Sequence, residues 1–230
     1  MDDIVLISSP EAAREHCDEY RKRIAELLQG GLPVLSNPEH AKAVRMLIQY
    51  ADLQITRVAL WSDGPVDLLA YVTRNLLEWS LWCEYLSEAP TNIDALLDKE
   101  AGVDVMDMLR LNPALNQALH ARVFPPDNTK GPVYKAALER AQNANITLLK
   151  TLEAEYGQRP KRVQLSDFRN EIEDFVFKMC SKLVHPTSLS ILLLPNYTEA
   201  HLETTVFNLR SVALFYAKVG LDALLAMPSI

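Results

Sequence analysis

Three chemically active side chains, Lys178, Ser181 and His185, lie near the end of one amphipathic segment, Phe177–Pro186 (FKMCSKLVHP). In a helix, residues three and four apart share a face, so an ammonium, a hydroxyl and an imidazole would line up along two turns. A histidine at a helix C-terminus gains proton affinity from the helix dipole, and the proline at 186 ends the helix there. His185 is therefore the best candidate in the chain for a general acid or base, with Ser181 within its reach.

These side chains belong to a predicted helix that runs from about Ser166 to the proline at 186. At about 100° per residue, Ser181 and His185 point away from the apolar stripe of this helix. Two interpretations follow: a solvated polar face whose histidine caps the helix, or a surface where a second subunit or a ligand docks. The stripe expected to face the core comprises Phe168, Ile172, Phe175, Val176, Met179, Cys180, Leu183 and Val184.

A second helix, predicted from Pro65 to Glu88, is apolar almost all round. Its charged residues recur too often for a membrane span, so we expect the central helix of a bundle. Arg74 and Glu78 lie four residues apart in it, and charges in such a helix are costly unless they are paired. We expect both to be largely buried, either as an internal ion pair or as part of the lining of a site.

Composition places these helices in a globular protein. The 230 residues carry a net charge of −7, with 49% hydrophobic and 23% charged residues. The acidic balance argues against a protein that binds nucleic acid or membranes over its whole surface. No segment shows the two-residue alternation of a strand. We predict an all-α fold: a single domain, 1–230, built as an antiparallel helical bundle of about six to eight helices, with the N-terminal helix at 10–29 as a candidate peripheral element.

Capping residues divide the chain into helices. We expect the segment Thr91–Leu111 to be interrupted around Gly102, and a helix over Pro132–Tyr156 to be closed by Gly157. Predicted helix starts are at Ser9, Asn37, Asp63, Asn112 and Thr198.

No pattern in the sequence indicates a cofactor, a metal or a disulfide framework. The three cysteines lack CxxC spacing, and no nucleotide-binding or hydrolase motif occurs. Glu199, His201 and Glu203 are two residues apart on a predicted helix, which puts them on different faces. The acidic N-terminal segment lacks the basic region of a signal peptide, so we expect a cytoplasmic protein.

Two motifs together carry a family resemblance: Arg74-Asn75-Leu76-Leu77-Glu78 in the apolar helix, and the segment Phe177–Pro186. The chain resembles uncharacterised bacterial helical proteins related to the HEPN superfamily. The resemblance implies a HEPN-like bundle and metal-independent RNA cleavage at a homodimer interface, often in toxin–antitoxin or antiphage systems. In that family an arginine precedes a histidine, with four to six residues between them. Here His185 takes the histidine position and Lys178 stands where the arginine is expected.

Two functions follow, and the sequence leaves open whether the protein is an enzyme. The first is an RNA-acting homodimer of a toxin or antiphage defence system. In it His185 is the acid or base, Ser181 orients it, and Lys178 or Arg74, the latter paired with Glu78, stabilises phosphate charge. The second is a non-catalytic helical interaction or scaffold protein that uses the same polar face for a partner. Expected partners are a second copy of the chain and RNA or a protein, and not a membrane.

Overall fold

The computed structural model of the chain describes residues 6–31, 38–88, 98–111, 132–158, 169–185 and 194–226. Seven α-helices and two short helical turns make up most of these ranges, and no strand occurs in them. The all-α prediction is thus confirmed for this part of the chain. The chain divides into two compact units, Met1–Ile93 with Gln164–Ile230, and Asp94–Val163. The expectation of a single domain stays a prediction.

The first unit holds most of the helices. In chain order they are α1 (Pro10–Glu26), the π-helical turn η1 (Leu27–Gly31), α2 (Pro38–Leu60), α3 (Val66–Glu88), α6 (Glu171–Val184), the 3-10 turn η5 (Leu194–Asn196) and α7 (Glu199–Leu225). The second unit contains a helix at 98–111 and α5 (Pro132–Tyr156).

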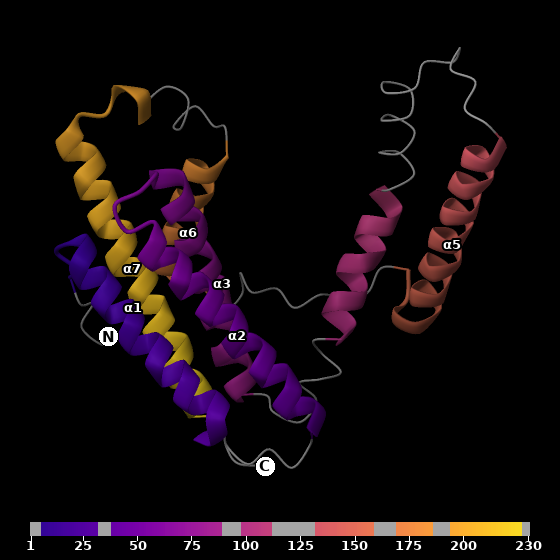
Figure 1. The fold of residues 1–230 in the computed structure, drawn as a ribbon, viewed down its shortest axis with the longest axis horizontal. Coiled ribbons are helices and arrows are strands. Elements are labelled where there is room, and N and C mark those ends of the chain that lie inside the picture. Colours follow the sequence, from indigo (N-terminus) through magenta and orange to yellow (C-terminus); the bar gives the residue numbers. More distant parts are fainter. Residues whose placement is uncertain are drawn as a thin grey trace. The chain divides into compact units, whose positions relative to one another are not determined.

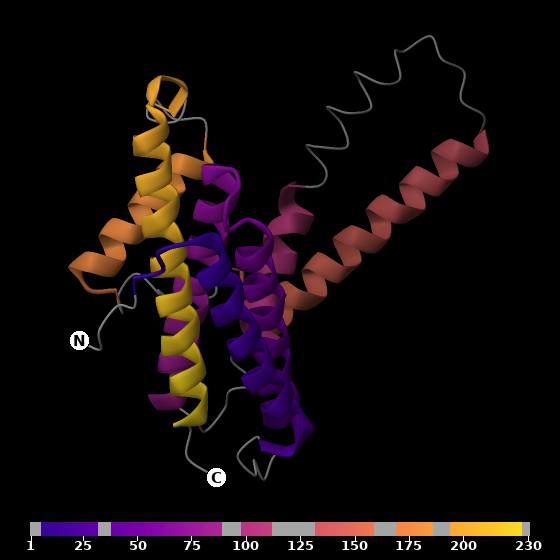
Figure 2. The same ribbon diagram turned by 60° about the vertical axis from the view of Figure 1, so that its left-hand side comes forward.

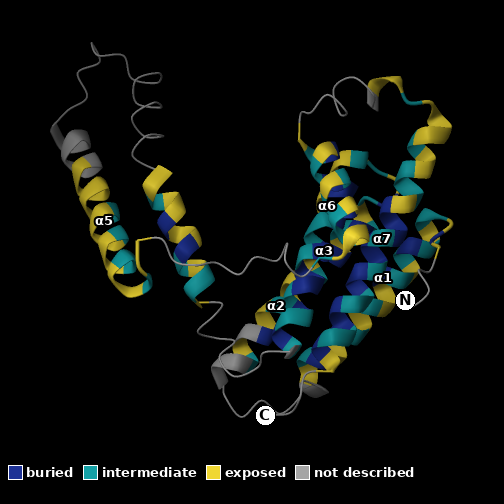
Figure 3. Ribbon diagram, turned by 180° about the vertical axis from the view of Figure 1, so that it is seen from behind, coloured by how far each residue is buried: buried dark blue, intermediate teal, exposed yellow. Residues whose placement is uncertain are grey.

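Helix α3 is the central helix of the first unit, as predicted. It packs most extensively on α7 and also contacts α6 and α2, while α1 packs on α2 and α7 (Figure 1). Helix α6 crosses α7 obliquely (Figure 2). Buried residues gather where these helices face one another (Figure 3), and α1 contributes Ala13, Cys17 and Ile24. The N-terminal helix is therefore packed into the bundle.

The close approach of α3 and α7 depends on Gly220. A Cβ atom at this position would lie no farther than 2.8 Å from three indole atoms of Trp79. The indole is fixed from its other side, because its Nε1 donates to the Leu47 carbonyl of α2 at 3.0 Å. The Thr73 hydroxyl of α3 also lies 3.2 Å from the Leu209 carbonyl of α7. These contacts join three helices around one buried tryptophan.

Capping confirms two of the predicted helix starts. The Ser9 hydroxyl accepts from the Ala12 N–H at 3.1 Å, and the Thr198 hydroxyl accepts from the His201 N–H at 3.3 Å. Helix α3 begins at Val66, three residues after the predicted start at Asp63, so Asp63 does not cap it. The Asp63 carboxylate pairs with Arg14 instead. The remaining predicted caps, Asn37 and Asn112, lie outside the described residues.

In the second unit, the expected break at Gly102 does not occur, and the helix at 98–111 runs through this glycine. Packing explains why this position holds a glycine, because a Cβ atom here would lie within 3.2 Å of three ring atoms of Tyr156. The Tyr156 hydroxyl donates to the Asp98 carboxylate at 2.6 Å, which fixes the ring. Gly157 follows α5 with a φ of 87°, as expected of a glycine that closes a helix.

Helix α6 starts later than predicted, at Glu171 rather than near Ser166. Asn170 caps it in a reciprocal capping box with Glu173, and residues 169 and 170 are not helical. The buried stripe is also narrower than predicted, since Ile172 and Phe175 are 49% and 64% exposed. Among the helices described, α6 packs chiefly on α3, so only a narrow stripe of it is covered. Its buried residues are Val176, Cys180 and Leu183.

The three cysteines, Cys17, Cys83 and Cys180, are all buried, and each is a free thiol. Within the described ranges, no helix is long and apolar enough to cross a membrane.

Candidate functional site

His185 lies on the wall of an open groove at one end of the first unit. Four segments meet there: the start of α1, the turn between α2 and α3, the end of α6 and the N-terminal part of α7. The groove has a volume of about 1260 Å³. Its lining comprises Ser8, Pro10, Asp63, Gly64, Pro65, Val66, Asp67, Leu183, Val184, His185, Glu199, Leu202, Glu203, Thr204, Val206, Phe207 and Arg210.

The position of His185 follows from how α6 ends. The helix stops at Val184, and His185 adopts an extended conformation with φ −93° and ψ 153°. Its backbone N–H still donates to the Ser181 carbonyl at 3.1 Å. A following proline disfavours the α conformation, which accounts for the change of direction. The predicted helix end is confirmed, and the His185 side chain is exposed.

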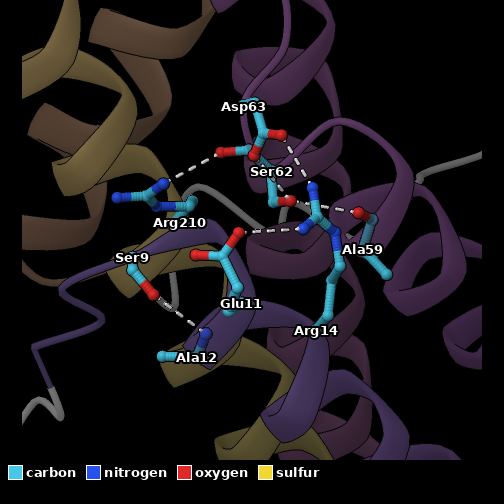
Figure 4. Close-up of polar contacts among 8 residues, drawn as sticks. All are labelled: Ser9, Glu11, Ala12, Arg14, Ala59, Ser62, Asp63 and Arg210. Atoms are coloured by element: carbon cyan, nitrogen blue, oxygen red, sulfur yellow. Dashed lines mark hydrogen bonds and ion pairs between the residues drawn. The ribbon is translucent and has the colours of Figure 1, made fainter.

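Arg210, on α7, ties three segments together at the groove. The residue is only 6% exposed, and its Nη1 donates to the Ser62 carbonyl at 3.1 Å (Figure 4). Its Nη2 reaches the Ile7 carbonyl at 3.5 Å, while Nε is buried without a hydrogen-bond partner. Burial lowers the pKa of Arg210, and the charges of Asp63 and Glu11 act in the opposite direction.

Sequence reasoning missed Arg210. The sequence did place an arginine in the largely apolar last long helix, where a buried charge needs hydrogen-bond partners. Its partners are backbone carbonyls distant in sequence, at Ser62 and Ile7, and no residue pattern indicates such acceptors.

The rim of the groove is acidic. Four carboxylates line it, from Asp63, Asp67, Glu199 and Glu203, and all four residues are exposed. Asp63 is paired with Arg14 at 2.7 Å (Figure 4). Against these four charges the lining carries one guanidinium and the imidazole of His185. Such a surface attracts cations and repels phosphates.

Between these charges the groove is apolar. The side chains of Leu183 and Val184 come from the end of α6, and those of Leu202, Val206 and Phe207 come from α7. Apolar surface bounded by charge is typical of a binding site rather than of a solvated helix face.

Arg74 and Glu78 were predicted to be largely buried; the structure gives both an intermediate burial, and Nε of Arg74 is buried without a hydrogen-bond partner. Their side chains are 28% and 37% exposed, and Arg74 Nη2 lies 3.6 Å from Glu78 Oε1. The Arg74 guanidinium stacks over the Phe177 ring of α6, 4.5 Å from its centroid. Phe177 precedes His185 by eight residues, about 12 Å along the helix axis. Neither Arg74 nor Glu78 lines the groove.

The two other predicted site residues take different positions on α6. Lys178 is 68% exposed and forms an ion pair with Asp174 one turn earlier. Ser181 is half-buried, and its Oγ is buried without a hydrogen-bond partner. Of the five predicted site residues, only His185 lines the groove.

No metal centre is evident in the described residues, where no group of three or more His, Cys, Asp or Glu side chains could hold an ion. His201 contacts the Thr198 hydroxyl at 3.0 Å through Nδ1.

The chain matches no protein-family model, no curated protein and no solved structure. The resemblance to HEPN-like proteins therefore stays a prediction.

Proposed function

We propose that this chain is a non-catalytic interaction protein whose groove beside His185 binds a basic, amphipathic segment of another polypeptide. The observation that carries this proposal is the lining itself, four exposed carboxylates around apolar side chains. Carboxylates at the rim would pair with lysine or arginine side chains of the partner. The apolar interior would take its hydrophobic residues.

The buried Arg210 supports the choice of a polypeptide. Its Nε is a donor without an acceptor, and a buried donor in that state costs about 1–3 kcal/mol. A backbone carbonyl is the acceptor that every polypeptide carries. A partner segment can therefore offer cations to the rim and a carbonyl oxygen to the groove wall.

Fluorescence anisotropy tests the proposal with two labelled amphipathic peptides of equal length, one with lysines on its polar face and one with glutamates. The lysine peptide should bind, and its affinity should fall with salt because the rim charges are exposed. The double variant Glu199→Gln/Glu203→Gln should weaken binding between about twofold and thirtyfold, since each exposed pair contributes about 0.2–1 kcal/mol.

The matched control is Glu15→Gln/Glu26→Gln, which removes the same charge from exposed positions on α1 outside the groove. The control should leave affinity nearly unchanged. Equal loss in both double variants would mean that net charge alone attracts the peptide. Equal binding of the glutamate peptide would refute the groove as a cation-binding site.

A second candidate function is RNA cleavage by a homodimer, in a toxin or antiphage defence system. The observation that favours it is the exposure of His185 at the end of α6, with Ser181 one turn behind. Lys178 pairs with Asp174, and neither Lys178 nor Arg74 lines the groove beside His185, so the cation that binds the phosphate at His185 would come from elsewhere. Cleavage of single-stranded RNA in EDTA that His185→Ala abolishes, with a dimeric mass in light scattering, would favour this function over the first.

A further inference from the structure

The structure assigns a binding site for phosphate or a phosphoryl group to the neighbourhood of Phe177, formed by Arg74 of α3, Arg169 at the start of α6 and Ser181 of α6. The site is distinct from the groove, whose lining contains none of these residues. It therefore stands independently of the proposed partner segment.

Two guanidinium groups share the ring of Phe177. Arg74 lies 4.5 Å and Arg169 lies 3.9 Å from the ring centroid, measured at Cζ. The two Cζ atoms cannot be farther apart than the sum of these distances. Like charges repel at such separations, and an anion bound to both groups would offset that repulsion.

Unsatisfied donors are concentrated at this place. In the described ranges, six buried side-chain nitrogen or oxygen atoms lack a hydrogen-bond partner, and four belong to this cluster. They are Nε of Arg74, Nε and Nη1 of Arg169, and Oγ of Ser181. Ser181 follows Phe177 by four residues, which places both on one face of α6. Each unmade bond is costly, and a ligand that supplied acceptor oxygens would remove the cost.

Nearby carboxylates do not occupy these donors. Glu78 approaches only Nη2 of Arg74, at 3.6 Å, which is longer than a hydrogen bond. Glu173 accepts from the Asn170 N–H at 2.9 Å in the capping box. Asp174 pairs with Lys178, which points to solvent. Glu173 and Asp174 are thus engaged elsewhere, while Glu78 lies close to Nη2 of Arg74.

Phosphate fits this donor set better than a carboxylate does. Its oxygens point in four directions, whereas those of a carboxylate lie in one plane. Charge-assisted N–H···O bonds to an anion are about 2.8 Å long and roughly twice as strong as bonds between neutral groups. Planar guanidinium groups also bind phosphate in a bidentate manner, and a hydroxyl adds a donor from a third direction.

Isothermal titration calorimetry of the full chain with inorganic phosphate, at constant ionic strength, tests the site. We expect one saturable site in the unaltered protein. Arg169→Gln and Arg74→Gln should each weaken binding about tenfold or more, since hydrogen bonds to charged groups are the stronger class. Arg21→Gln is the matched control, because it removes an exposed arginine of α1 that pairs with Asp52. This control should bind phosphate as the unaltered protein does.

Two further variants keep the test decisive if a glutamine variant loses its helical circular dichroism signal. Arg169→Lys keeps the charge but not the planar fork, and it should still weaken binding. Phe177→Leu keeps an apolar side chain but removes the ring on which both arginines stack, and it should do the same. Unchanged affinity in the folded variants, or the absence of saturable binding to the unaltered protein, would overturn the site.

Titration with adenosine 5′-monophosphate distinguishes the sources of the group. Equal affinities for this nucleotide and for phosphate would assign the site to free phosphate or to any exposed phosphoryl group. Tighter binding of the nucleotide would assign it to a phosphorylated small molecule. Binding of single-stranded RNA without any binding of phosphate would refute the small-anion site in favour of a polynucleotide surface.

Discussion

Gly220→Ala is expected to destabilise the first unit although alanine is the better helix former. Alanine in a helix interior is favoured over glycine by about 1 kcal/mol. The added methyl group, however, would lie no farther than 2.8 Å from three atoms of the Trp79 indole, which is 2% exposed. Carbon atoms in contact are normally about 3.5–4.0 Å apart, so the ring or α7 must move by about 1 Å.

The tryptophan cannot move without a cost of its own. Overpacking of a core typically costs about 1–3 kcal/mol. Displacement of the indole also stretches its bond to the Leu47 carbonyl, and a buried N–H left without a partner costs about 1–3 kcal/mol. Against these costs stands the gain of about 1 kcal/mol in helix propensity. The net loss is therefore about 3 kcal/mol.

Urea denaturation followed by circular dichroism measures this loss, with the melting midpoint as a second readout. A loss of about 3 kcal/mol corresponds to a fall of about 6–12 °C in a domain of this size. Trp79→Phe replaces the bicyclic indole with a smaller ring, so the double variant should lose less stability than the two single variants predict together. A Gly220→Ala protein as stable as the unaltered one would refute the claim that this glycine sets the spacing of α3 and α7.

Three further changes test local interactions by urea denaturation. Ser9→Ala should cost about 1 kcal/mol, because it removes the cap of α1, and an unchanged midpoint would contradict the cap. Glu78→Ala should cost at most about 1 kcal/mol, since the pair is part-exposed, and a loss of several kcal/mol would restore the buried-pair interpretation. Burial raises the pKa of Asp222, but hydrogen bonds from Lys218 and Arg23 outweigh it, so the net pKa is lowered. A carboxyl group with a lowered pKa stabilises the fold above about pH 4, and this stabilisation is lost as the pH falls through the folded pKa. Asp222→Asn should therefore be less stable than the unaltered protein at pH 7 and about equally stable at pH 2. An equal loss of stability at pH 7 and at pH 2 would show that the ionisation of Asp222 does not contribute to stability.

Local signals predicted the helices well. Helix ends at Ser9, Thr198 and Gly157 depend on contacts between residues that are close in the sequence, so a short stretch of sequence is enough to predict them. The break predicted at Gly102 was wrong because the role of this glycine depends on a residue distant in the sequence. A glycine inside a helix and a glycine between helices look alike in sequence, and only the ring of Tyr156, distant along the chain, decides between them.

The candidate site was harder to predict, because it is assembled from residues far apart in the chain. His185 could be found from the end of α6 alone. The acidic rim could not, because Asp63 and Asp67 come from one turn, Glu199 and Glu203 from another helix, and nothing local relates them. Arg74 illustrates the same limit. Its apolar helix predicted burial among other helices, whereas its side chain is 28% exposed and its guanidinium lies over the ring of Phe177.

The packing of α3 on α7 has a consequence for folding during synthesis on the ribosome. About 110 residues separate Glu88 from Glu199, so at 5–20 residues per second the ribosome needs about 5–20 s to add them. During that interval the surface of α3 that α7 later covers, including Trp79, has no α7 to pack on. Nascent chains that end before Glu199 should therefore expose apolar surface to chaperones, and this exposure should fall once α7 has left the ribosome.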